Sequence, residues 1–207
     1  MKYIKMLGLM AVAATALMAF AGIASATELY TVEGGVHKTV AKGSPLAATL
    51  EPETTASLTD TAGNPIETCT ESGVEGTIGN AGGSAATVSG PVSFLSFKGG
   101  AACSVTVNQS LNGTLELHHI AGTTDGTVTG SGFHVTLHVF GTTCVYGLGE
   151  TKKDLGTLKG STTGKATMDI NTVVFEQTAP KFLCPDSGKW VAKYWVTSPN
   201  PLFVEAS

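Results

Sequence analysis

Apolar and polar residues alternate along much of this chain, and the pattern is clearest over residues 133–146. The apolar side chains there fall at every second position, namely Phe133, Val135, Leu137 and Val139. A period of two residues is the spacing of a β-strand with one buried face. We therefore predict a central strand in this stretch, with most of the remaining chain covering its apolar side.

The same alternation recurs in shorter segments, which turn residues separate about every 8–12 positions. This pattern predicts an all-β fold of antiparallel strands, most simply a sandwich, with a barrel as the alternative. Glycine-rich residues 73–83 are expected to form a flexible loop or a weakly specified hairpin. The other expected strands are residues 28–32, 36–41, 46–50, 66–70, 85–89, 92–97, 102–107, 111–120, 127–129, 154–160, 165–176, 182–184, 190–197 and 202–205.

The first 26 residues have the pattern of a secretory signal peptide. Lys2 and Lys5 precede an apolar run that extends from Met6 to about Phe20, and residues 24–26 read Ala-Ser-Ala, a small-x-small cleavage pattern. A membrane anchor is the alternative, but the run is shorter than the ~20 residues that a helical span needs. We expect a helical signal peptide over residues 1–26 and a single secreted β domain over residues 27–207.

The charge of the exported part argues against two classes of partner. The 12 basic residues fall to 10 when Lys2 and Lys5 are removed, against 16 acidic residues, which gives a formal charge of −6. The chain contains no arginine. Binding of nucleic acid needs concentrated positive charge, and so does attraction to anionic lipid. We therefore expect neither nucleic acid nor, after signal cleavage, a membrane as a partner.

The sequence contains four cysteines, and an even number in an exported chain favours disulfides. Three pairings are possible, and we favour Cys69–Cys103 with Cys144–Cys184, because these two closed loops are similar in length. Zinc binding by the cysteines would need close pairs of the C-x-x-C kind. None is present, so we do not expect a cysteine-bound metal.

A histidine cluster is the main candidate for chemistry. If residues 115–120 pair antiparallel with residues 133–139, His118 faces His134 on the polar side, with Glu116 nearby. Two imidazoles and a carboxylate can hold a divalent metal, and such a site would make a metal-dependent hydrolase conceivable. The alternative is a solvated sheet face rich in His and Thr, and we expect no cofactor other than this one candidate metal.

A tryptophan near the C-terminus is the candidate ligand platform. Along residues 189–197, Trp190 and Tyr194 share one face, which we expect to be the core. Lys193 and Trp195 then lie on the opposite face, where an exposed aromatic ring can stack on a sugar or on a partner protein. The alternative is that both tryptophans are buried between two layers.

Two sequence motifs of catalysis are absent. Residues 160–165 read Gly-Ser-Thr-Thr-Gly-Lys, but a phosphate loop needs one more residue between its glycines and a Ser or Thr after the lysine, where this chain has Ala166. This segment is expected to be a hairpin turn. The Gly-x-Ser-x-Gly elbow of serine hydrolases does not occur.

Several segments resemble those of small secreted proteins encoded in actinobacterial genomes, a group without an assigned activity. The segments are residues 68–72, 160–167, 182–185, 189–190 with Ala192 and Tyr194, 196–199 and 201–204. The resemblance implies a bacterial origin, export and a β-rich fold. It transfers no functional residues.

These observations together predict a secreted or cell-surface protein, associated with the cell wall or released, that has a binding or structural role without catalysis. Its partner is expected to be a glycan or a cell-surface protein. A secreted hydrolase centred on His118 and His134 is one alternative function. A glycan-binding module centred on Trp195 is the other.

Overall fold

The computed structural model describes residues 26–80, 82–83, 87–108, 113–139, 141–177 and 184–207, and these residues form strands and turns without any helix. Residues 1–25 of the predicted signal peptide lie outside the described residues. No helix long and apolar enough to cross a membrane was found among the described residues. The strands are β1 (Thr27–Glu33), β2 (Val36–Thr39), β3 (Pro45–Leu50), β4 (Ala56–Thr59), β5 (Pro65–Cys69), β6 (Glu71–Thr77), β7 (Val88–Lys98), β8 (Val105–Val107), β9 (Thr114–His119), β10 (Gly126–Ser131), β11 (His134–Val139), β12 (Thr142–Gly147), β13 (Lys153–Lys159), β14 (Thr167–Glu176), β15 (Ser187–Ser198) and β16 (Phe203–Ala206).

Eight strands close into an antiparallel barrel in the order β15-β3-β6-β7-β9-β10-β13-β14, and the pairing of β14 with β15 completes the circle. The prediction of an all-β antiparallel fold stapled by disulfides is confirmed, and of the two architectures considered the structure has the barrel. Closure gives every barrel strand two hydrogen-bonded neighbours, so none of the eight is left as an edge along its whole length.

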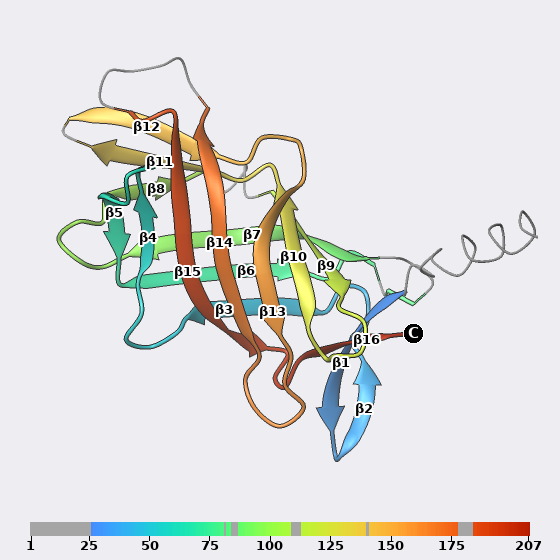
Figure 1. The fold of residues 1–207 in the computed structure, drawn as a ribbon. Coiled ribbons are helices and arrows are strands. Elements are labelled where there is room, and N and C mark those ends of the chain that lie inside the picture. Colours follow the sequence, from blue (N-terminus) through green and yellow to red (C-terminus); the bar gives the residue numbers. More distant parts are fainter. Residues whose placement is uncertain (1–25, 81, 84–86, 109–112, 140, 178–183) are drawn as a thin grey trace, which may run out of the picture.

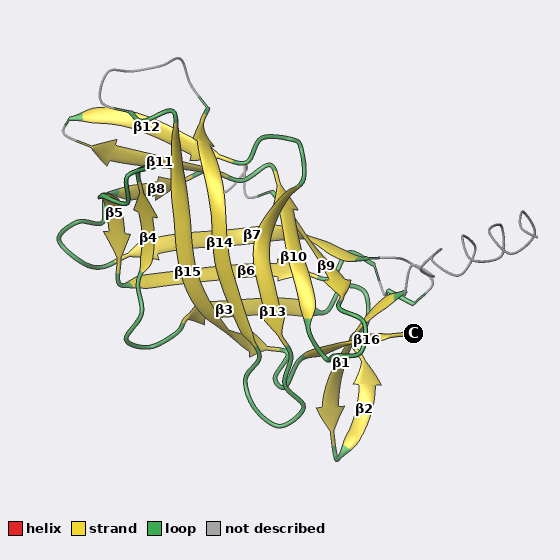
Figure 2. Cartoon of the chain, viewed as in Figure 1, coloured by secondary structure: helices red, strands yellow, loops and turns green. Residues whose placement is uncertain are grey.

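The remaining strands extend this barrel at its two ends (Figures 1 and 2). At one end β4 and β5 pair beside β15, while β12, β11 and β8 continue from β14. At the other end β16, β1 and β2 form a separate three-stranded sheet. The long hairpin of β14 and β15 spans the barrel and the first of these extensions, because its strands have 10 and 12 residues.

The prediction of a single central strand over residues 133–146 is wrong. This stretch forms two strands, β11 and β12, which pair with each other from His134↔Gly147 to Val139↔Thr142. Gly141, whose φ is 79°, lies in the turn between them. The buried positions are odd-numbered in β11 and even-numbered in β12, as Leu137 opposite Cys144 shows, so the phase of the alternation changes at the turn, and the prediction overlooked this change. The hairpin lies outside the barrel, and β14–β15 is the element that joins the two parts.

The glycine-rich segment also differs from expectation, because part of it forms the barrel strand β6. A side chain at Gly76 would place its Cβ 2.5 Å from the carbonyl oxygen of Pro91 on β7. Glycine is therefore required here by the close approach of two barrel strands, rather than by a loop. Residues 88–98 form the single strand β7, where two strands were expected.

The interior of the barrel is packed with alternate side chains of its strands. Its fully or nearly fully buried residues include Leu95, Val128, Leu155, Leu158, Ile170 and Tyr194. Tyr194 is the largest polar side chain among them. Its hydroxyl lies 2.8 Å from the Oγ of Ser72 on β6, which in turn donates to the carbonyl oxygen of Ser96 on β7.

Both favoured disulfides are confirmed, Cys69–Cys103 and Cys144–Cys184. The first joins the end of β5 to the segment before β8, where the Thr68 amide also donates to the carbonyl oxygen of Ala102. The second joins β12 to the segment that precedes β15. The expected hairpin turn at residues 160–165 is present too, since β13 and β14 pair on either side of it.

Candidate functional site

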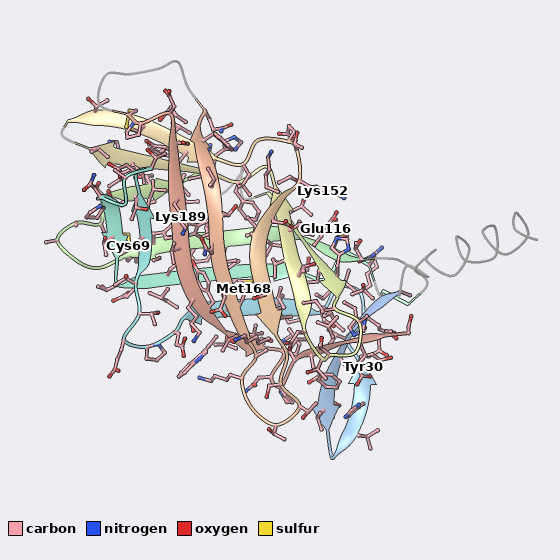
Figure 3. All side chains as sticks on the ribbon, in the orientation of Figure 1. Tyr30, Cys69, Glu116, Lys152, Met168 and Lys189 are labelled. Atoms are coloured by element: carbon pink, nitrogen blue, oxygen red, sulfur yellow. A yellow bond between two sulfur atoms is a disulfide. The ribbon has the colours of Figure 1, made fainter. Side chains whose placement is uncertain are left out.

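The outer face of the β14–β15 hairpin carries three of the five large apolar side chains that are exposed among the described residues. Met168 on β14 and Ala192 on β15 point inward and are buried in the barrel. The residues at alternate positions of each strand therefore point to solvent. The register places Asn171 opposite Val191, and Val173 opposite Lys189, whose position Figure 3 marks. This face is therefore an open strip of sheet.

Three residues of this strip are large, apolar and exposed, and we call them the apolar group: Val173, Phe175 and Val191. Their exposed fractions are 48%, 43% and 38%. Val173 and Val191 lie on a diagonal of the same face, within reach of one partner surface. Isolated exposed apolar residues need no explanation, but aligned ones on adjacent strands are typical of a contact surface.

Lys193 and Trp195 continue the outer face of β15 beyond the apolar group. Lys193 Nζ lies 2.9 Å from the Glu51 carboxylate, and this hydrogen bond raises the pKa of the lysine. Trp195 is half-buried, and Lys165 Nζ lies 4.3 Å from the centre of its ring. A cation over an indole is a favourable contact, so the ring already has one partner within the chain.

The opposite face of β15 is the core, as expected. Tyr194 is fully buried, and Trp190 is half-buried with its ring 6.0 Å from that of Phe97 in an edge-to-face arrangement. The alternative in which both tryptophans lie between two layers does not describe Trp195, which is on the outer face.

The pairing on which the histidine metal site depended is wrong. β9 pairs with β7 and β10, and β11 pairs with β8 and β12. His118 is thus opposite Thr127, while His134 is opposite Gly147. Alternation on each strand gave the correct polar faces, but it contains no information about which strands become neighbours.

Glu116 has a different partner from the one proposed for it. Its carboxylate forms an ion pair of 2.8 Å with Lys152 Nζ, at the place labelled in Figure 3. Glu116, His118 and His134 are not among the groups of metal-ligating atoms that come within 4.8 Å of one another in the described part of the chain. The structure therefore does not bring the ligand atoms of these three residues together.

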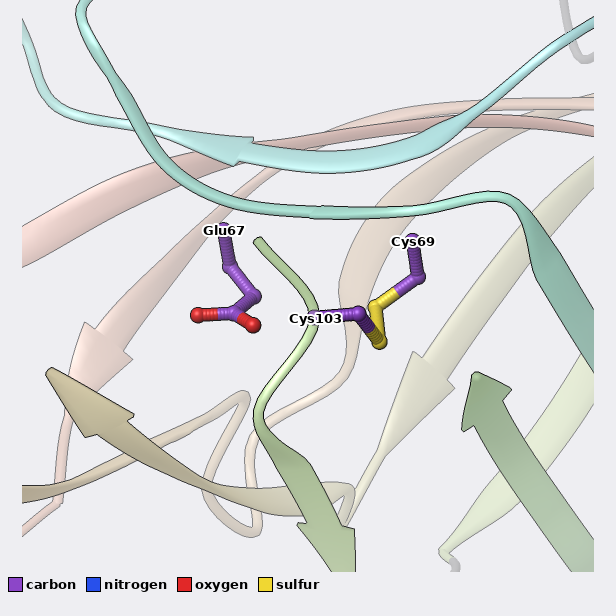
Figure 4. Close-up of side chains that lie close together, drawn as sticks. All are labelled: Glu67, Cys69 and Cys103. Carbon is purple, nitrogen blue, oxygen red and sulfur yellow. A yellow bond between two sulfur atoms is a disulfide. The ribbon is translucent and has the colours of Figure 1, made fainter. Parts of the chain in front are cut away.

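Two carboxylates that the sequence analysis did not single out lie beside the disulfides. Glu67 accompanies Cys69 and Cys103 (Figure 4), and Glu176 accompanies Cys144 and Cys184, with the ligand atoms of each set within 4.8 Å. The sulfurs are bonded to each other, so they are not available as thiolate ligands. Glu67 accepts hydrogen bonds from the amide and hydroxyl of Ser104.

An apolar cavity of about 60 Å³ lies between the barrel and the β4–β5 and β8–β11–β12 extensions. Cys69 and Trp190 are both part of its wall. The other wall residues are Ala56, Ser57, Leu58, Glu67, Leu95, Phe97, Val105, Phe133, Val135, Leu137, Tyr146, Gly147, Leu148 and Val174. By analogy with cavities made by mutation, 60 Å³ left empty costs on the order of 1–2 kcal/mol of stability. A smaller space of about 40 Å³ lies within the barrel itself.

Comparison with known proteins adds no family to this geometry: the chain matches no protein-family model, no curated protein and no solved structure.

Proposed function

We propose that this chain is a secreted or cell-surface protein that binds a partner without catalysis, and that the partner contacts the outer face of the β14–β15 hairpin. The observation that carries the proposal is the apolar group, Val173, Phe175 and Val191, aligned on two adjacent strands of the barrel. Burial of such residues against a partner contributes about 25 cal/mol for each Å² removed from water, from which the entropic cost of association is subtracted.

The scaffold beneath this surface supports a binding role. β14 and β15 are paired along nine residues each, and each strand has further neighbours in the barrel or its extensions. A rigid surface loses little conformational entropy when a partner binds. Two disulfides favour an oxidising compartment, which agrees with export and with an extracellular or cell-wall location.

Binding of labelled mature protein to intact cells of the source organism tests this proposal. We expect saturable binding that weakens at least about tenfold when Val173 and Phe175 are both replaced by serine, because residues at the centre of an interface provide most of its energy. The matched control is the double serine variant of Val36 and Phe94, which are 61% and 38% exposed on other strands. Equal binding of the two double variants, or no saturable binding, would contradict the proposal.

A glycan-binding module is the second candidate, and the outward position of Trp195 is the observation that favours it. In the sheet Trp195 is paired with Thr167 on β14 and with Thr49 on β3, whose hydroxyl groups can bond to sugar hydroxyls. A glycan array with the mature protein tests it. The expected result is a signal that Trp195→Ala abolishes and Phe94→Ala leaves unchanged, whereas silence across the array would reject this candidate.

A further inference from the structure

A buried carboxylate lies directly beside the disulfide that joins β5 to the segment before β8. One carboxylate oxygen of Glu67 and the sulfurs of Cys69 and Cys103 all lie within 4.8 Å of one another (Figure 4). Glu67 is 5% exposed, and its carboxylate accepts hydrogen bonds from the amide and the hydroxyl of Ser104. These hydrogen bonds hold a negative charge next to the sulfur–sulfur bond.

The cross-link between the two segments does not itself require this charge. The disulfide and the hydrogen bond from the Thr68 amide to the carbonyl oxygen of Ala102 already join them. A neutral glutamine at position 67 could accept the same hydrogen bond from the Ser104 amide. Burial of a charged group is more costly than burial of a neutral one. The cross-link alone therefore does not account for a carboxylate at this position.

Exposure of the two cysteines decides how an external thiol would reduce this disulfide. Cys103 is partly exposed whereas Cys69 is buried, so a small thiolate attacks the Sγ of Cys103. A mixed disulfide forms, the bond between the two protein sulfurs breaks, and its electron pair leaves on the Sγ of Cys69, which takes a proton from water. A second small thiolate then attacks the mixed disulfide, which releases the Cys103 thiolate and the oxidised small disulfide.

The first of these two steps is the one that the Glu67 carboxylate opposes. The attacking thiolate is an anion that approaches a fixed negative charge. The electron pair then leaves on the Cys69 sulfur, again within 4.8 Å of the carboxylate. Repulsion between like charges at this distance slows such a step by about tenfold or more at a protein surface.

We propose that Glu67 protects the Cys69–Cys103 disulfide from exchange with thiols in the surroundings of the exported protein. The protection is kinetic, because the carboxylate raises the barrier to thiolate attack. None of the three residues belongs to the apolar group, so the proposed binding face and this protection can fail independently.

Reduction of the mature protein by 2-mercaptoethanol tests the protection, with alkylation and mass spectrometry to locate the freed thiols. Glu67→Gln should raise the initial rate at Cys69–Cys103 about tenfold. Glu71→Gln, which removes an exposed carboxylate two residues after Cys69, should leave that rate unchanged. Cys144–Cys184 is the internal control, since both of its cysteines are buried, and its initial rate should be the same in all three proteins.

Two charged thiols separate repulsion from a loosening of the fold, because a loosened fold admits both equally. 2-Mercaptoethylamine is a cation and 2-mercaptoethanesulfonate is an anion. In the unsubstituted protein, the rate at Cys69–Cys103 for a given thiolate concentration should be at least about fivefold higher with the cation. Glu67→Gln should reduce this preference at least about threefold, and Glu71→Gln should not.

Three results would overturn the proposal. One is an equal rate with the two charged thiols in the unsubstituted protein, a comparison that needs no variant. Another is a preference for the cation that Glu67→Gln leaves unchanged, which would mean that the carboxylate only holds Ser104 in place. The last is an unchanged rate of Glu67→Gln with 2-mercaptoethanol.

Discussion

A buried pair of hydroxyl groups links three strands of the barrel at the scale of single residues. Ser72 Oγ donates its one proton to the carbonyl oxygen of Ser96, so the bond of 2.8 Å between Ser72 and Tyr194 must have the Tyr194 hydroxyl as donor. Loss of Ser72 would leave that fully buried hydroxyl without its acceptor. Loss of the Tyr194 hydroxyl would leave Ser72 with its bond to Ser96 intact.

This asymmetry predicts unequal costs for two small substitutions. Ser72→Ala should lower the free energy of unfolding by about 1–3 kcal/mol, the cost of an unsatisfied buried polar group. Tyr194→Phe should lower it by about 1 kcal/mol, the net value of one hydrogen bond. Urea unfolding of both variants measures the difference, and a larger loss in Tyr194→Phe would refute the assigned donor.

Tyr146 and Tyr194 make stability sensitive to alkaline pH. Burial, with the charges of Glu176 and Asp186, raises the pKa of Tyr146 to about 12, and burial raises the pKa of Tyr194 as well. Tyrosine in an unfolded chain ionises near pH 10. The neutral tyrosines therefore contribute stability that is fully present below about pH 10 and is lost as pH rises through the folded pKa values.

We expect the urea midpoint to fall steadily between about pH 10 and about pH 12, in parallel with phenolate absorbance of the unfolded chain. Tyr146→Phe should make this fall shallower, because it removes one of the tyrosines whose pKa the fold raises. A midpoint that stays constant over this range, or that falls equally in the variant, would show that Tyr146 is not held neutral by the fold.

At the scale of elements, β6 shows how a strand with weak propensity is fixed by its neighbours. Its glycines lower the intrinsic preference for a strand, yet it pairs with β3 on one side and β7 on the other. The two glycines differ in what surrounds them. A Cβ at Gly76 would meet the backbone of Pro91 at 2.5 Å, whereas one at Gly73 would meet the Ser96 hydroxyl at 3.3 Å.

The two glycines therefore offer a matched pair of substitutions. Gly76→Ala should destabilise the protein by about 2–4 kcal/mol, because rigid backbone must move to admit the methyl group. Gly73→Ala should change stability by less than about 1 kcal/mol, because a serine hydroxyl can rotate away. Chemical unfolding compares them, and equal losses would mean that the spacing between β6 and β7 does not require glycine at position 76.

At the scale of the whole molecule, the part that could be predicted from the sequence is the part encoded by local patterns. Alternation located most strands and put Tyr194 inside and Trp195 outside, since side chains on successive residues of a strand point in opposite directions. Loop lengths were enough to choose the correct disulfide pairing.

Neighbour relations between distant strands could not be predicted in the same way. β15 pairs with β3, which lies about 150 residues earlier in the chain, as in the pair Val196↔Ala48. No local pattern in the sequence indicates that contact. No local pattern indicates either that His118 lies beside Thr127 and not beside His134. The cavity wall, Trp190 included, comes together through the same long-range pairings, and for that reason it was missed as well.

Nuclear Overhauser contacts between backbone protons across the eight strand interfaces are the most direct measurement of the closed barrel. The structure predicts contacts at all eight, including β14–β15 through Ile170↔Ala192 and β15–β3 through Val196↔Ala48. A sandwich of two sheets would lack them at two or more interfaces, because each sheet has two free edges. That second result would contradict the barrel and the outer face proposed on it.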